Sequence, residues 1–236
     1  TDIAMGTTIL LGQMIGEGKR EDSGDVVGAS IAMFAAAGIG VAVVMQFLAA
    51  PVAEIMNAPE AAFSQTVAYI RICCGGAVFI VAYNVLGSIF RGIGNSKVPL
   101  MAVAIAAVLN IFGDLLFVAV FNMGAAGAAY ATVISQAFSV VISLIIIRKM
   151  GLPVDVGIKK IRFDGGLIGR IVRLGAPIAL QDLLVSISFL IIMAIVNKIG
   201  VVASAGVGVA ERLCGFIMLV PSAFMQSMSA FVAQNY

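Results

Sequence analysis

The chain of 236 residues contains no histidine and no tryptophan, and charged residues make up only 11% of it. Without histidine it lacks the commonest general base and the commonest metal ligand of proteins. We therefore expect that it is not an enzyme and that it needs no cofactor or transition metal. The net charge is only +2, and no basic run is interleaved with aromatic residues, so we expect no nucleic-acid partner.

Hydrophobic residues, in contrast, make up 61% of the chain, whereas about 45–50% is usual in soluble proteins. The run 26–50 contains no charge, and about 20 apolar residues suffice to cross a bilayer. The fold class predicted is all-α, a polytopic transmembrane helical bundle of about seven helices, the first of them partial. The predicted helices cover residues 1–15, 26–50, 66–90, 99–121, 125–147, 171–196 and 203–234. Because Thr1 lies within an apolar segment, we expect the chain to be a fragment of a longer protein.

The loops between these helices differ sharply in charge. Alternate loops, at 13–25, 91–97 and 148–173, hold eleven Lys or Arg residues, and the intervening loops hold one, Lys198. Because cytoplasmic loops of membrane proteins are enriched in Lys and Arg, we predict that the basic loops are cytoplasmic. Residues 148–170 form the longest of them, and we interpret this segment as a basic cytoplasmic linker between two bundles.

One predicted hairpin carries polar residues at membrane depth. Between residues 99 and 121 the only strongly polar residues are Asn110 and Asp114, which share one helix face because they are four apart. Gly124 turns the chain, and Thr132 follows on the next helix. Since Asp114 and Thr132 each lie about 10 Å from the turn along a helix, an antiparallel hairpin brings them to one depth. A carboxylate in the membrane is costly and usually functional, so we predict a proton or cation site, with sodium as the one metal considered, at Asp114, Asn110 and Thr132.

Two further helices carry charges away from their ends. Asp182, beside Gln181, lies five residues after Pro177, and both a cavity-lining role and a pair with Gln181 or a nearby arginine remain open for it. Glu211 and Arg212 are adjacent and point about 100° apart, so they are poorly placed to pair with each other. For Glu211, a cavity position and a structural interhelical pair are both open.

A short internal repeat links the first and last predicted helices. Gly12-Gln13-Met14-Ile15 at the end of the first helix matches Ala233-Gln234-Asn235-Tyr236 at the end of the last one. Both copies end a helix on the side predicted to be cytoplasmic. Such a repeat is typical of transporters built from two similar bundles.

Five short motifs stand out along the chain: Gly12-Gln13 with Gly16-Glu17-Gly18, RGIGNSKVP at 91–99, GAAGAAYAT at 124–132, LGAP at 174–177 and AQNY at 233–236. In these motifs the sequence resembles the multidrug and toxic compound extrusion (MATE) family of secondary transporters. The resemblance implies a two-lobe transporter, with twelve helices in two lobes around a central cavity. Residues 1–147 would then be most of the first lobe (family helices 2–6), and residues 171–236 the start of the second (helices 7–8).

The family also implies a site. One branch places a cation or proton site in the first lobe, and its Asn, Asp and Thr match Asn110, Asp114 and Thr132; its remaining Asp lies on the first helix, which this chain does not contain. The other branch uses a Glu on the seventh helix, where this chain has Val185, which argues against that chemistry.

The function implied is secondary active multidrug efflux, in which drugs or organic cations are exchanged for H⁺ or Na⁺. The membrane would be the inner (plasma) membrane of a bacterium, and the complete protein would be monomeric. The nearest alternative is a flippase for lipid-linked precursors from the same wider superfamily. Such proteins line their cavity with several cations, whereas the mid-helix charges here are mostly acidic. An intramembrane enzyme would need a catalytic pair, and Asp114 and Asp182 lie in different predicted bundles. Nothing suggests the repeated filter residues of a channel.

Overall fold

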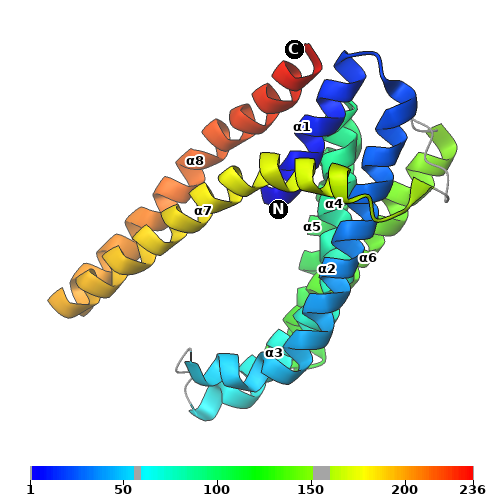
Figure 1. Ribbon diagram of the computed structural model, residues 1–236. Coiled ribbons are helices and arrows are strands. Elements are labelled where there is room, and N and C mark those ends of the chain that lie inside the picture. Colours follow the sequence, from blue (N-terminus) through cyan, green and yellow to red (C-terminus); the bar gives the residue numbers. More distant parts are fainter. Residues whose placement is uncertain (1, 56–59, 151–159, 236) are drawn as a thin grey trace.

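The protein is a helical bundle throughout the part of the chain that the structure, a computed structural model, describes: residues 2–55, 60–150 and 160–235 (Figure 1). In chain order the helices are α1 (Asp2–Gly16), α2 (Arg20–Ile55), α3 (Glu60–Gly75), α4 (Ala77–Gly92), α5 (Lys97–Asp114), the π-helix η1 (Leu115–Val120), α6 (Gly124–Met150), α7 (Gly165–Ile199) and α8 (Val201–Asn235).

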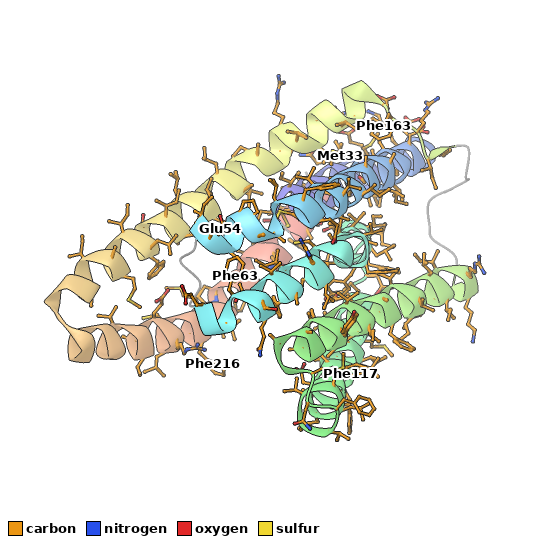
Figure 2. The ribbon with its side chains drawn as sticks, turned by 90° about the horizontal axis from the view of Figure 1, so that it is seen from below. Met33, Glu54, Phe63, Phe117, Phe163 and Phe216 are labelled. Atoms are coloured by element: carbon orange, nitrogen blue, oxygen red, sulfur yellow. The ribbon has the colours of Figure 1, made fainter. Side chains whose placement is uncertain are left out.

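These helices confirm the predicted all-α transmembrane architecture. Among the described residues, five helices are long and apolar enough to cross a membrane, and the bent pair α3–α4 brings the number to six if it is one span. Their outer faces carry large apolar side chains that are largely exposed in the described part of the chain. Phe216 on α8, for example, is 77% exposed (Figure 2). Such surfaces fit a hydrocarbon environment, where apolar side chains need no protein cover.

The first predicted loop is much shorter than the charge pattern indicated. We expected a loop over residues 13–25, but α1 continues to Gly16 and α2 begins at Arg20. Gly18 turns the chain with a φ of 78°. Next to it, Lys19 forms a salt bridge of 2.6 Å with Glu17, and this hydrogen-bonded ammonium lowers the pKa of the Glu17 carboxyl. Dense charge therefore does not mark the end of a helix here.

Proline also failed to end a helix. We expected Pro51 to close the second helix and residues 51–65 to form a connection, but Pro51 lies inside α2, which continues to Ile55. Long membrane helices tolerate proline, because neighbouring groups satisfy the backbone that it leaves free. On the far side of residues 56–59, which lie outside the described part, α3 already begins at Glu60.

The third predicted helix is two helices bent by 48°. The break falls at Gly76, between α3 and α4. A Cβ atom at Gly76 would clash with the Val133 side chain of α6, so only glycine allows this close approach. The bend therefore depends on packing against α6, which hydrophobicity along α3 and α4 does not reveal.

Helix α1 lies at the centre of the molecule and contacts α2, α4, α7 and α8. The buried apolar core gathers around it, with Leu10, Leu11 and Met14 of α1 packed against residues from α2, α4 and α7, namely Val26, Val27, Val85, Ile89 and Ile171. Backbone contacts with α7 are tight at Gly6, which faces the backbone of Ile171 and Gly175. Small residues at such crossings allow membrane helices to approach closely.

Helices α7 and α8 form a long hairpin. At one end of the molecule α8 ends beside the ends of α1 and α4, and from there the hairpin diverges from the bundle of α2 to α6 (Figure 1). The segment expected to be the linker is partly helical, because α6 continues to Met150 and α7 begins at Gly165. Asp164 caps α7, since its Oδ1 accepts from the backbone N–H groups of Gly166 and Leu167 at 2.9 and 3.0 Å. Residues 151–159, with Lys159, lie outside the described part.

Candidate functional site

The predicted polar hairpin is formed by α5, η1 and α6. Asp114 is the last residue of α5, and the chain continues directly as the π-helix η1. At the end of η1, Phe121 N donates to Leu116 O, five residues earlier, at 3.0 Å. Short π-helical segments often occur at functional sites. Phe117 marks the position of η1 at the tip of this hairpin (Figure 2).

Asn110 and Thr132 meet across the hairpin. Asn110 Nδ2 donates to Thr132 Oγ1 at 3.4 Å, and Thr132 Oγ1 in turn donates to Ala128 O within its own helix at 3.0 Å. The predicted equal depth grouped Thr132 with both Asp114 and Asn110, and in the structure Asn110 is the residue that forms a hydrogen bond with it.

The two helices come this close because small residues line their contact. A Cβ atom at Gly113 would lie 2.9 Å from the Cβ of Ala131, and one at Gly127 would lie 3.0 Å from Phe117. Gly113 directly precedes Asp114, and Ala131 directly precedes Thr132. The glycines therefore bring the polar residues of both helices to one interface.

Asp114 itself has an unpartnered oxygen. Its Oδ1 atom is buried and accepts no hydrogen bond from any described residue. Burying a charged oxygen without a partner is strongly unfavourable. The site therefore holds a free carboxylate oxygen near the side-chain oxygens of Asn110 and Thr132, and oxygen is the ligand type that hard cations prefer.

Tyr69 of α3 lies within electrostatic reach of the Asp114 carboxyl, a neighbour that the sequence did not reveal. In the sequence Tyr69 had a simpler explanation, because tyrosines commonly lie at the edge of the membrane. Only the packing of α3 against α6 brings this residue towards the hairpin.

The three residues predicted to line a cavity lie elsewhere. Gln181 and Asp182 on α7 and Glu211 on α8 are all exposed. In the described part of the chain, neither α7 nor α8 contacts α5, η1 or α6, so these residues do not join the Asp114 site. The interhelical ion pair considered for Glu211 is not formed with any described residue, where Lys19–Glu17 is the only salt bridge.

Comparison with known proteins gives consistent findings. The MatE family model matches residues 2–116 and 177–236. The probable multidrug resistance protein YpnP of Bacillus subtilis (strain 168) is 29% identical over 230 residues, which are 97% of this chain and 51% of that protein. The chain thus spans about half the length of the curated relatives it matches.

Two solved structures share the fold. A crystal structure of MATE in the bent conformation has a TM-score of 0.89 at 23% identity. The match covers 99% of this chain and 52% of the chain in that structure. A MOP superfamily transporter from Pyrococcus furiosus Vc1 also has a TM-score of 0.89 at 23% identity, over 99% of this chain and 51% of the chain in that structure. For that transporter, a reversed polarity of the binding pocket suggests a different function. At this identity the likeness concerns the fold alone.

Proposed function

The chain belongs to the MatE family of multidrug and toxic compound extrusion transporters, and we propose that the intact protein exports drugs or organic cations in exchange for protons or sodium ions. Residues 1–147 would supply most of one lobe, residues 148–170 a cytoplasmic linker and residues 171–236 the start of the other lobe. The curated relative named above is described as a probable multidrug resistance protein, which supports this substrate class.

The observation that carries the proposal is the unpartnered Oδ1 atom of Asp114, beside the Asn110–Thr132 hydrogen bond. A coupling ion must bind, and must leave again, at each cycle. A carboxylate oxygen that is already satisfied by the protein would not need the ion, whereas an unsatisfied one gains a partner when the ion binds. The coupling site in our proposal is therefore Asp114, with Asn110 and Thr132 as its neighbours.

Binding at Asp114 would affect the whole lobe through helix packing. Asp114 ends α5 where η1 begins, and α6, which carries Thr132, also holds Val133 against the bend at Gly76. Neutralising the carboxylate would change the electrostatic environment of Asn110 and Thr132. This change would bias the packing of α6 against the α3–α4 bend, and thus the balance between two conformations that differ in drug affinity.

The energy available to such an exchange is sufficient. One charge moving inward through 100 mV supplies about 2.3 kcal/mol. A tenfold concentration ratio requires about 1.4 kcal/mol, so one ion supports roughly a fifty-fold drug gradient. This estimate holds for either H⁺ or Na⁺.

The substrate would enter between the two lobes, and the exposed Gln181, Asp182 and Glu211 would face it. Two of the three are acidic, which favours a cationic substrate over the phosphate groups that a lipid-precursor flippase must bind. Arg212 and Lys198 are the only cations of this hairpin beyond residue 173. We therefore favour drug export over the flippase.

The proposal can be tested with the intact parent protein in inverted membrane vesicles. An imposed pH gradient, with or without sodium, should drive uptake of a lipophilic cation in the wild type and fail to do so in Asp114→Asn. Asp164→Asn is a matched control, because Asp164 caps a helix on the surface and should leave uptake unchanged. Uptake that survives Asp114→Asn would exclude Asp114 as the coupling site. If the protein transports phosphate-containing lipids and no lipophilic cation, the flippase would be favoured.

A further inference from the structure

The end of α4 has an unusual hydrogen-bond partner. The last carbonyl groups of any helix lack partners within the helix. Three of those at the end of α4 are satisfied locally: Ile89 O by Ile93 N at 3.0 Å, Phe90 O by Asn95 N at 2.8 Å and Arg91 O by Gly94 N at 3.0 Å. The fourth, Gly92 O, accepts from Gln234 Nε2 of α8 at 2.8 Å.

This bond joins distant parts of the chain, 142 residues apart. In the described part of the molecule it is the only side-chain hydrogen bond between the α7–α8 hairpin and helices α1–α6. Its position depends on glycines. A Cβ atom at Gly94, whose φ is 82°, would lie 3.1 Å from Gln234 Nε2, and one at Gly12 of α1 would lie 3.0 Å from the Cβ of Ala233.

Gln13 occupies the corresponding place in the other copy of the internal repeat. Gly12-Gln13 at the end of α1 aligns with Ala233-Gln234 at the end of α8, and the two pairs lie against each other. Gln13 lines the surface between α1 and α8 together with Met225, Met228 and Val232. Its side chain forms no hydrogen bond with a described residue, although it carries the same amide donor as Gln234.

We propose that Gln234 and Gln13 are a symmetric pair of latches that hold the two lobes together on the side predicted to be cytoplasmic. Gln234 reaches from the second lobe to the last free carbonyl of α4 in the first. Gln13 reaches from the first lobe to the last free carbonyl of the matching helix in the second lobe, which lies outside this chain. The inference goes beyond the proposed transport function and rests on it only in requiring that the lobes move apart.

The test measures lobe separation rather than transport. In the intact protein with its native cysteines replaced, spin labels at Ser96→Cys and Phe231→Cys report the distance between the ends of α4 and α8; both positions are exposed. Gln234→Met keeps the size of the side chain but removes the donor. Since a neutral hydrogen bond contributes about 0.5–1.5 kcal/mol, the ratio of separated to closed populations should rise about two- to ten-fold. Gln13→Met should have a similar effect.

Asn235→Ala is the matched control, because Asn235 Nδ2 donates to Phe231 O within its own helix at 2.9 Å. It should leave the distances unchanged. If Gln234→Met does not fold, Gln234→Glu removes the same donor. The latch would be overturned if the distances stay unchanged in the Gln234 variants, or if Asn235→Ala changes them equally. The pairing of the two latches would be overturned if Gln234→Met changes the distances and Gln13→Met does not. Because no drug is added, these outcomes are independent of whether Asp114 couples transport to an ion.

Discussion

At the scale of single residues, Thr132 links the two helices of the site. Its hydroxyl accepts from Asn110 and donates to Ala128 O. Thr132→Val preserves the shape of the side chain but removes both bonds. Since such a bond contributes about 1 kcal/mol, the apparent affinity for the coupling ion should fall about five-fold. Drug efflux measured as a function of pH and of sodium concentration would show this shift.

The control for this prediction is Thr132→Ser, which keeps the hydroxyl and should retain most of the affinity. An affinity unchanged in Thr132→Val, or lost equally in both variants, would show that the hydroxyl does not serve the ion.

Part of this site was predictable from sequence and part was not. The spacing of Asn110 and Asp114 placed both on one helix face, and the polar residues of an apolar hairpin pointed to Thr132. The hydrogen bond between Asn110 and Thr132 could not be predicted, since equal depth on the hairpin names no partner, and no sequence pattern indicated the π-helix η1. Tyr69 was missed because its proximity to Asp114 arises from tertiary packing between α3 and α6.

At the scale of helices, glycines decide which elements touch. Gly175 of α7 faces the backbone of Ile3 on α1, and a Cβ atom there would lie 2.6 Å from the Ile3 carbonyl oxygen. Gly175→Val should therefore separate α1 from α7 and cost about 1–3 kcal/mol, as overpacking usually does. A lower apparent melting temperature of the purified intact protein would report this loss.

Gly169 provides the comparison, because it lies on the same helix and a Cβ atom there would meet nothing within 4 Å. Gly169→Val should leave the melting temperature nearly unchanged. Equal losses in the two variants would mean that the effect comes from valine in the helix and not from the contact with α1.

Helix boundaries show where sequence reasoning loses accuracy. The number and order of the apolar helices followed from hydrophobicity, because crossing a bilayer demands long apolar runs. Charged residues, Pro51 and Gly76 marked boundaries less well. The first turns of α2 are charged but helical, Pro51 continues α2, and Gly76 bends a span that hydrophobicity alone joined. At Gly76 the reason is a tertiary contact, because the Val133 side chain of α6 lies against the break.

At the scale of the whole molecule, the charge pattern predicts which side of the membrane each end occupies. A cysteine at Ser96, before α5, should react with a membrane-impermeant maleimide only from the cytoplasmic side. One at Met123, which is 39% exposed in the short connection before α6, should react only from the outside. Labelling of right-side-out and inverted vesicles compares the two directly, and the reverse pattern would invert the topology and place the latch residues outside.

In the proposed transport cycle, Asp114 is the group that exchanges the coupling ion for the drug. The most direct measurement is the number of protons released when a saturating lipophilic cation is added to the purified intact protein in weakly buffered, sodium-free solution. We predict release of about one proton per protein in the wild type, because one carboxyl group, that of Asp114, gives up its proton when the drug binds. We predict no release in Asp114→Asn. Undiminished release from Asp114→Asn would contradict the account and would move the exchanging group to another carboxylate, with Asp182 and Glu211 the first to test.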